Sequence, residues 1–518
     1  MEGKIGVTSA DKIIEEIGGC GRFQWRLSAL IHAMKTVVAF CMVASVIMSK
    51  KPTAWWCRTP YVVNATGIIV DATASCASRP NATNCFLKTC RPGNASNCET
   101  YEYDNSPSTL VTEFDLLCDW SWVPSTIMSI QLGGVLLGNF FGGLLADMFG
   151  RKPVLFASIF VLTVSNLVGY LAGSWVLMAA SRLFVGLGCG LFLNTQYSYL
   201  CEFTLAQDRP LAIGFPSWAI QHCLFALLAW LLKDWRNIQL MVLLACLPTF
   251  FAWWWIPESF RWYIAHDKQH QAMAVVKQVS KFNKKTPRDL GLLLIESKQL
   301  KPPKKSAFLD LFRSKQLLRL TVLLASNWVA LGLITYGINY GIQGLSGNVY
   351  LNIFLFNLAT IPTKSVTIWL SNRLGRRLST IVIFVLIVIA GLVCGIIQSI
   401  DTPYKGGLTN GLSMAVYFCI GAAWGPIQTM TIELYPTLIR TSGFGCLSVL
   451  ARVGAMIGPQ LVFLDKFAPG LLYYCCAGIS VVCVICQLFL PETKNAALND
   501  NMDYLKEKGA DTAKNEPI

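Results

Sequence analysis

The sequence predicts an all-α membrane protein in which twelve transmembrane helices form two pseudo-symmetric halves of six. Hydrophobic residues make up 54% of the 518 residues and charged residues only 14%, which is too little charge for a water-soluble chain of this length. Long apolar runs, each able to cross a hydrocarbon core of about 30 Å, alternate with polar loops. Several polar signals recur in the same order in the later part of the chain, which indicates a duplicated unit.

The clearest repeat is GGLLADMFGRK at 142–152, whose counterpart is WLSNRLGRRL at 369–378. Each copy ends an apolar run with a polar residue, Asp147 or Asn372, and continues with a glycine and two bases. So much charge cannot lie in hydrocarbon, so each copy is expected to be a tight loop on the cytoplasmic face. The other pairs in register are Glu202 and Arg209 with Glu433 and Arg440, and PES at 257–259 with PET at 491–493.

The order of apolar and polar runs divides the chain into seven segments. We expect a cytoplasmic N-terminus at 1–22 without a cleavable signal, a first helix at 23–47, an extracellular domain at 48–121, helices 2–6 within 122–256, a cytoplasmic linker at 257–317, helices 7–12 within 318–490 and a cytoplasmic tail at 491–518. The expected spans are Phe23–Ile47, Trp122–Ala146, Pro153–Ala172, Trp175–Leu200, Leu211–Leu232, Ile238–Ile256, Leu318–Gly341, Val349–Leu370, Thr380–Ile400, Leu408–Ile432, Thr441–Leu464 and Gly470–Leu490.

The net charge of +14 does not indicate nucleic-acid binding, because the bases lie largely in loops between apolar runs, as the positive-inside rule requires. The polar segment after the first helix has a different character. It holds six of the 19 cysteines and three N-x-S/T sequons. An even cysteine number with clustered sequons predicts an extracellular, disulfide-bonded and glycosylated domain. The sequence does not determine which cysteines pair with each other. These residues are Cys57, Cys76, Cys85, Cys90, Cys98 and Cys118, with Asn64, Asn81 and Asn94.

Four ionisable side chains fall near the middle of expected spans: Lys35, His222, Lys364 and Arg452. A charge at that depth is costly, so it normally faces a cavity and marks a substrate or ion path. The acidic residues of the spans fall at the expected cytoplasmic ends instead. The central cavity is therefore expected to be basic, and an anion is its natural partner.

Each of these four residues has a structural alternative. Arg452 offers a planar fork that suits a carboxylate or sulfonate, or it pairs with helix-end carbonyls or a cytoplasmic acid. Lys364 faces the cavity, or its ammonium extends toward the cytoplasmic end. The depth of Lys35 depends on where the first helix begins. For His222 we favour a neutral, hydrogen-bonded packing residue over a cavity-facing donor that titrates near neutral pH.

Two aromatic residues are further candidates for the cavity, Trp218 on the fifth span and Tyr336 on the seventh, with core packing as the alternative. The cytoplasmic turns form a candidate gate, because charges there can pair when that side is shut. Asn372 replaces the acid in the second copy, so we expect the first copy to contribute more. The gate residues are Asp147, Gly150, Arg151, Glu202, Arg209, Asn372, Arg376, Glu433 and Arg440.

GGLLADMFGRK, the PESFRW segment at 257–262, the SRLFVG segment at 181–186 and the long Cys-rich first loop together resemble the major facilitator superfamily, and within it the organic cation, carnitine and organic anion transporter family. The resemblance covers nearly the whole chain. It implies polyspecific transport of small organic ions across the plasma membrane by alternating access. In the resembled family anion and carnitine carriers have arginine near Arg452, whereas cation carriers have aspartate, and Lys364 matches a lysine of the anion branch. Tyr336 resembles an aromatic residue of that branch's pocket.

We therefore expect a multi-pass carrier of organic anions, and the resemblance adds exchange for an intracellular dicarboxylate. A carrier of zwitterions or cations is the first alternative, but no mid-membrane acid is evident for an ammonium group. A receptor that binds a nutrient without transport is a second alternative, which the duplicated turns disfavour. No metal-ligand spacing, nucleophile elbow or phosphate-binding glycine loop is present, so we expect no enzyme activity and no cofactor. The expected partners are the substrate and the lipid bilayer, with the protein a monomer.

Overall fold

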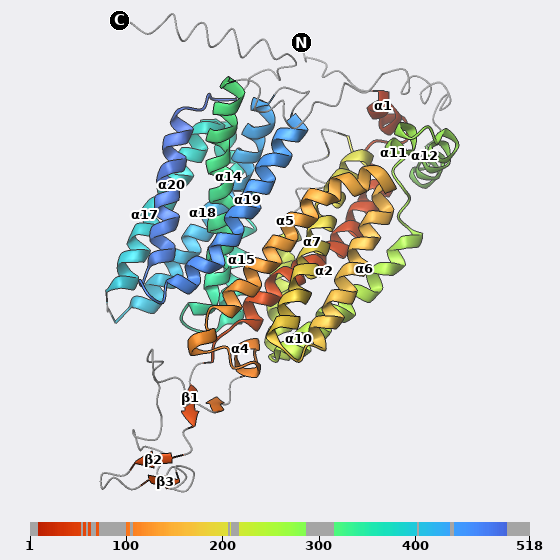
Figure 1. Cartoon of the computed structure of the whole chain (residues 1–518). Coiled ribbons are helices and arrows are strands. Elements are labelled where there is room, and N and C mark those ends of the chain that lie inside the picture. The colour runs from red at the N-terminus through yellow and green to blue at the C-terminus, as the bar shows by residue number, and fades with distance from the viewer. Residues whose placement is uncertain are drawn as a thin grey trace, which may run out of the picture.

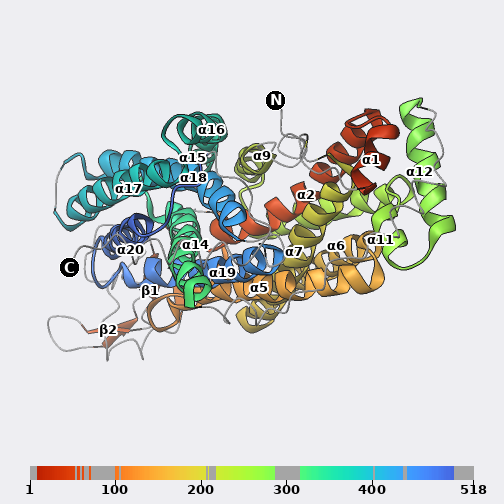
Figure 2. The ribbon, with the colours of Figure 1, turned by 90° about the horizontal axis from the view of Figure 1, so that it is seen from above.

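The structure, a computed structural model, describes residues 9–52, 55–58, 61–63, 69–71, 100–103, 107–205, 208, 217–285, 315–400, 403–435 and 440–494. It is a helical bundle of two groups of helices that lie side by side (Figure 1) and stay separate when seen from above (Figure 2). The first group follows the first part of the chain and the second group follows the last part, as a duplicated architecture requires.

The first half contains helices α1 (Ser9–Glu16), α2 (Arg22–Met48), α5 (Val123–Phe149), α6 (Arg151–Tyr170), α7 (Trp175–Phe203), α9 (Ser217–Leu232) and α10 (Trp235–Cys246), the last continued by the 3-10 helix η3 (Leu247–Trp254). The second half contains α14 (Lys315–Gly341), α15 (Val349–Thr360), α16 (Thr363–Leu374), α17 (Arg376–Ser399), α18 (Lys405–Leu434), α19 (Arg440–Leu464) and α20 (Leu471–Leu488). Between the halves along the chain are α11 (Phe260–Ala265) and α12 (Gln269–Asn283).

Small elements mark one end of the bundle, which we call the outer end. Four short strands form two antiparallel pairs: β1 (Trp55–Arg58) with β4 (Thr100–Tyr103), and β2 (Tyr61–Val63) with β3 (Ile69–Asp71). Helix α4 (Leu110–Glu113) and the 3-10 turn η2 (Cys118–Trp120) follow. The opposite end carries α1, α11 and α12 and is called the inner end (Figure 1). The expected extracellular domain thus lies at one end and the visible part of the expected cytoplasmic linker at the other.

Ten helices in the described residues are long and apolar enough to cross a membrane. The two remaining expected spans correspond to α9 and α18. Helix α9 is apolar but has 16 described residues, because the start of that expected span, 211–216, lies outside the described residues. Helix α18 has 30 residues and includes Thr409, Asn410, Gln428 and Glu433, which lower its apolar character.

The structure changes one expected span in form. The eighth span is expected as one helix, but it consists of α15 and α16, separated at Ile361 and Pro362. Ile361 and Pro362 keep helical dihedral angles, but proline has no backbone N–H to donate to the preceding turn, so the hydrogen-bond pattern of the helix is interrupted there. Lys364 lies in the first turn of α16, directly after this break.

The two halves meet along two pairs of helices, α5 with α19 and α9 with α15. Within the first half, α5 and α7 approach so closely that glycines are needed. A Cβ atom on Gly134 would overlap the carbonyl oxygen of Leu183, and one on Gly186 would overlap that of Gln131. Backbone contact of this kind places α5 and α7 as one unit against the second half.

Most cysteines and sequons of the expected extracellular domain fall outside what the structure describes. This applies to Asn64, Asn81 and Asn94, to Cys76, Cys85, Cys90 and Cys98, and to the side chain of Cys57. Cys118 does not count among the free thiols of the described residues. Glycosylation and disulfide pairing of this segment therefore stay predictions.

Candidate functional site

A cavity between the halves is the centre of the candidate site. It is lined by residues of α2, α5 and α9 from the first half and of α14 and α18 from the second. Its lining is apolar and aromatic with a few amide and hydroxyl groups, which is the usual make-up of a small-molecule pocket. The lining residues are Met42, Val43, Met128, Trp218, His222, Thr335, Tyr336, Asn339 and Tyr417.

Arg452 on α19 is attached to this cavity through Tyr336. Its Nη1 donates a hydrogen bond to the Tyr336 hydroxyl at 2.9 Å, so the tyrosine connects the guanidinium to the cavity lining. The Nε atom of Arg452 is buried and has no hydrogen-bond partner in the described part of the chain, and no described carboxylate pairs with this arginine within 4.0 Å. A buried guanidinium N–H without an acceptor is costly, and an anion would satisfy it.

Lys35 on α2 lies on the opposite half. Its Nζ donates to the Ser217 hydroxyl at 3.4 Å and lies 5.6 Å from the centre of the Trp218 ring, a cation–π distance. The charge of Lys364 acts on Lys35, although neither lysine is among the cavity-lining residues. The described residues supply no carboxylate partner for either lysine. Two uncompensated ammonium groups, one on each half, therefore lie near each other.

His222 is 2% exposed, and its Nδ1 lies 3.0 Å from Oδ1 of Asn357 on α15. Because the amide nitrogen of Asn357 already donates to the Ile353 carbonyl, the asparagine oxygen is the acceptor and Nδ1 of His222 is assigned as the donor. Neutral His222 then presents Nε2 as an acceptor, and this atom has no partner among the described residues. The ring links the two halves and offers the cavity an acceptor, so the packing alternative describes it better than an anion donor does.

Two polar networks beside these residues were not predicted. Asn339 donates to Tyr417 at 3.1 Å, and both line the cavity. Arg182 of the SRLFVG segment is 1% exposed and donates to Gln239, which in turn donates to Asn166 at 2.9 Å. This arginine joins α7, α10 and α6 inside the first half, so it organises that half and does not face the central cavity. Arg182 was not predicted because it lies near the start of a span, whereas the candidates were ionisable residues near the middle of each span.

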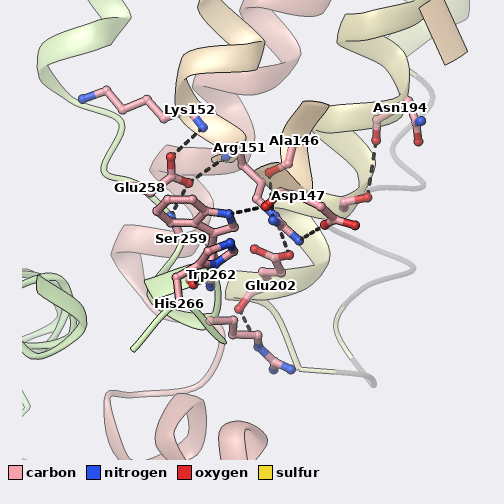
Figure 3. Close-up of polar contacts among 12 residues, drawn as sticks. Ala146, Asp147, Arg151, Lys152, Asn194, Glu202, Glu258, Ser259, Trp262 and His266 are labelled. Carbon is pink, nitrogen blue, oxygen red and sulfur yellow. Dashed lines mark hydrogen bonds and ion pairs between the residues drawn. The ribbon is translucent and has the colours of Figure 1, made fainter. Parts of the chain in front are cut away.

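The inner end carries a charge cluster on the first repeat (Figure 3). Arg151 forms ion pairs with Asp147 and Glu202, both at 2.9 Å, and it donates to the Ala146 carbonyl. Glu258 accepts hydrogen bonds from the backbone N–H groups of Arg151 at 2.9 Å and of Lys152 at 3.1 Å. A carboxylate at the start of α6 is favourable because the first N–H groups of a helix have no partner within the helix.

The second repeat reproduces this arrangement. Arg376 pairs with Glu433 at 3.3 Å, and Glu492 accepts from the backbone N–H groups of Arg376 at 2.8 Å and Arg377 at 3.1 Å. Asn372 stands where Asp147 stands in the first copy, so the second cluster has one acid fewer. The sequence repeat PES/PET thus supplies one carboxylate to each half, a role that the sequence comparison did not assign.

The glycine of each turn is required by both conformation and space. Gly150 has φ +105° and Gly375 has φ +93°, values that other residues rarely adopt. A Cβ atom on Gly375 would lie 2.5 Å from Oε2 of Glu492, and one on Gly150 would overlap the carboxylate of Glu258. Burial raises the pKa of Glu258 despite its backbone hydrogen bonds. In Glu492 burial also raises the pKa, but four backbone N–H groups lower it by more, so its net shift is downward.

These ion pairs lie inside one half each, so they join neighbouring helices and not the two halves. The gate expected from the sequence is therefore a set of two intra-half clusters in this conformation. Arg209 lies outside the described residues, as does the side chain of Arg440, so their expected pairings stay predictions.

The hydrogen bonds between the halves lie at the middle and outer end, along what we call the outer seam. Ser129 on α5 donates to the Met456 carbonyl at 2.8 Å, and Gln460 on α19 donates to Ser129 at 3.0 Å. The Tyr350 hydroxyl of α15 donates to the Lys233 carbonyl at 3.3 Å. Within the described ranges no hydrogen bond or ion pair joins the halves at the inner end, so this conformation is closed at the outer end.

A group of His, Cys, Asp or Glu able to hold a metal ion is absent from the residues that the structure describes.

The profile of a family described as "Sugar (and other) transporter" matches residues 79–502. Similar proteins include "Solute carrier family 22 member 4" of Mus musculus, 32% identical over 419 residues that cover 78% of this chain and 74% of that protein. "Solute carrier family 22 member 6-A" of Xenopus laevis is 29% identical, with 79% and 74% covered. "Organic cation/carnitine transporter 2" of Rattus norvegicus is 29% identical, with 78% and 73% covered.

Among solved structures, the inward open conformation of the xylose transporter XylE from E. coli superposes with a TM-score of 0.62 at 16% identity, covering 91% of this chain and 98% of that chain. Its partially occluded inward open conformation gives a TM-score of 0.63 at 15% identity, with 91% and 99% covered. At these identities the matches establish the fold alone.

Proposed function

The chain belongs to the sugar (and other) transporter family and, within it, to solute carrier family 22, and from this membership we propose that it carries small organic anions by alternating access. As a member it is a multi-pass transporter of the plasma membrane. The family includes relatives named for organic cations and carnitine, so the sign of the substrate must come from the charges of the site.

The observation that carries the proposal is the state of Arg452. This arginine is held beside the central cavity by Tyr336 and keeps a buried N–H without an acceptor. A carboxylate or sulfonate in the cavity would supply that acceptor. Because the described residues offer Arg452, Lys35 and Lys364 no acidic partner, an anion compensates them on arrival, whereas a cation would add to their repulsion.

The aromatic lining suits a carrier that accepts many substrates. Trp218, Tyr336 and Tyr417 contribute broad apolar surfaces, and contact with ring faces depends less on the exact shape of the substrate than hydrogen bonds do. From the family resemblance we add that uptake is coupled to exit of an intracellular dicarboxylate, which the same bases would bind.

Alternating access is supported by the distribution of contacts. Each half is joined internally by its own inner-end cluster, and the halves are joined to each other at the outer seam. We propose that the outer end faces the outside of the cell and that this conformation is inward-facing, with α9 and α18 completing twelve spans. Opening to the outside then requires the outer-seam hydrogen bonds to break.

A zwitterion carrier is the second candidate, and one observation favours it. Neutral His222 presents Nε2 as an unpartnered acceptor at the cavity, and the neighbouring rings offer cation–π contact. An ammonium group of the substrate would find its partner there while its carboxylate binds Arg452. In this case one molecule uses both the basic and the neutral part of the cavity.

The proposal is tested by flux of labelled solutes into proteoliposomes that contain the purified protein. The panel consists of one aromatic monocarboxylate, one dicarboxylate, one quaternary ammonium ion and one betaine. The proposal predicts uptake of the anions, accelerated by dicarboxylate loaded inside. Uptake of the betaine alone would identify the second candidate, uptake of the ammonium ion alone would contradict both, and binding without flux would indicate a receptor.

A further inference from the structure

A second cavity lies at the outer end, apart from the central cavity. Neither the proposed substrate site nor the family resemblance gives this cavity a role. It is lined by the end of α2 and the residues after it, the segment before α4, the connection between α9 and α10, and the start of α15. Three lysines contribute to its wall and no acidic residue does. The lining residues are Ile47, Lys50, Lys51, Pro52, Pro107, Ser108, Thr109, Lys233, Trp235 and Tyr350.

The carboxylates closest to this cavity along the chain, Asp234 and Glu113, are hydrogen-bonded to lining residues, and in the described part of the chain they form no ion pair with the three lysines. Asp234 accepts a hydrogen bond from the backbone N–H of Ser108 at 3.1 Å, and its charge reaches Tyr350. Glu113 is bound by Trp235 and Arg236. Within the described residues no ion pair connects Lys50, Lys51 or Lys233 to an acid. The cavity wall therefore carries three lysines without an ion-pair partner in the described residues.

A fourth lysine extends this basic region across the seam. Lys466 follows α19 in the second half, and its charge interacts with that of Lys51 from the first half. Its Nζ also lies 3.5 Å from the Ser121 carbonyl. Burial and the charge of Lys51 lower the pKa of Lys466 to about 7. Closing the outer end thus brings like charges together, which opposes closure unless something compensates them.

Closure of the outer end completes the cavity, because nine of its ten lining residues belong to the first half and Tyr350 comes from the second. Tyr350 belongs to the second half, and its hydroxyl reaches the Lys233 carbonyl of the first. Separation of the halves would remove Tyr350 from the lysines. The cavity volume is about 20 Å³, which is enough for one species of roughly water size.

We propose that this cavity binds one small inorganic anion of halide size from the outer solution and that the bound anion stabilises the closed outer end. A ligand that binds one conformation and not the other shifts the population toward the conformation it binds. The anion compensates Lys50, Lys51 and Lys233 where the halves meet, and it lowers the repulsion between Lys51 and Lys466. The proposal concerns binding at the seam, so it stands apart from the choice of transported substrate.

The test uses purified full-length protein and compares sodium chloride with sodium gluconate at constant ionic strength and pH 7. Chloride is expected to raise the melting temperature of the wild type, since binding to the folded protein stabilises it. In Lys50→Gln/Lys233→Gln the chloride concentration for half the effect should be at least tenfold higher. The matched control Lys277→Gln/Lys281→Gln removes two exposed charges from α12 at the inner end and should respond as the wild type does.

Three further arms keep the test decisive. Lys50→Arg/Lys233→Arg keeps both charges and should retain the chloride response. If the double glutamine variant fails to fold, Lys233→Gln alone should show the tenfold higher chloride concentration for half the effect. Arg452→Ala should keep the chloride response, which separates this cavity from the central one. Hydrogen exchange of the outer ends of α5 and α19 should be slower in chloride. An equal response in the lysine-to-glutamine variants, an equal effect of gluconate, or loss of the response in Arg452→Ala would overturn the proposal.

Discussion

Replacement of Arg452 by alanine tests the basic cavity most directly. The guanidinium donates one N–H to Tyr336 and keeps a buried Nε–H without an acceptor, so a bound carboxylate would gain at least one charge-assisted hydrogen bond. Such a bond contributes about 1.5–3 kcal/mol when one partner is charged. We take about 2 kcal/mol from this range, which corresponds to a roughly 30-fold weaker affinity for the anion.

The assay is initial uptake of a labelled aromatic carboxylate against concentration, normalised to protein at the cell surface. Arg452→Ala should raise KM roughly 30-fold, and Arg452→Lys should restore part of the loss, because one ammonium cannot reproduce the planar fork. Tyr336→Phe is the matched control: it removes one neutral hydroxyl and should cost about 1 kcal/mol or less, a change of up to roughly fivefold. Wild-type KM and maximal rate in well-expressed Arg452→Ala would refute the basic-cavity argument.

Four other outcomes are expected. Glu202→Gln should lower the maximal uptake rate more than Asp147→Asn does, and KM should be unchanged in both variants. The reason is that the Glu202 side chain is 15% exposed and that of Asp147 is 61% exposed, and water weakens exposed ion pairs. A raised KM at a normal maximal rate would contradict the gate assignment. Gly375→Ala should lower the melting temperature, whereas Gly411→Ala, whose Cβ meets nothing within 4 Å, should not. Closure of the outer end, measured by hydrogen exchange in α19, should strengthen as the outside pH rises from about 7 toward the ordinary lysine pKa of about 10.4, because the open state binds the Lys466 proton more tightly. Lys466→Gln should abolish this pH dependence, and closure that weakens as the pH rises would contradict the role of Lys466. Glycosidase should increase the gel mobility of the protein made in glycosylating cells, and the effect should vanish when the sequon asparagines are replaced, namely Asn64, Asn81 and Asn94.

Sequence reasoning predicted the duplicated helical architecture because hydrophobic runs and repeated turns are local features. It did not predict the break between α15 and α16, although Pro362 is a visible signal, because an apolar run on both sides of a proline still reads as one span. Arg452 and Tyr336 were predicted separately as candidates for the cavity, and no contact between them was predicted. That Tyr336 accepts a hydrogen bond from Arg452 depends on how α14 packs against α19, which the order of residues does not specify.

The repeated acids Glu258 and Glu492 also show that contacts between distant parts of the chain are not predicted by local sequence. Glu258 and Glu492 were recognised as matching positions, but each binds the start of a helix more than a hundred positions away along the chain. A contact at that separation follows from the fold and leaves no local pattern. His222 was described better, because burial of a lone histidine on an apolar helix is common enough for its neutral, hydrogen-bonded state to be the favoured prediction.

The outer seam has an energetic consequence for the rate of the transport cycle. Hydrogen bonds from Ser129, Gln460 and Tyr350 join the halves there, the His222–Asn357 bond joins them deeper in the protein, and each contributes only about 1 kcal/mol net. Since each half keeps its inner cluster intact, the losses when the halves rock apart are confined to the contacts between them, those of α5 with α19 and of α9 with α15. A difference of about 3 kcal/mol between two conformations still leaves the minor one populated at a fraction of a percent. Any solute that binds the outward conformation better by a similar amount would then reverse the balance, so the protein can be driven through its cycle by binding energy of ordinary size.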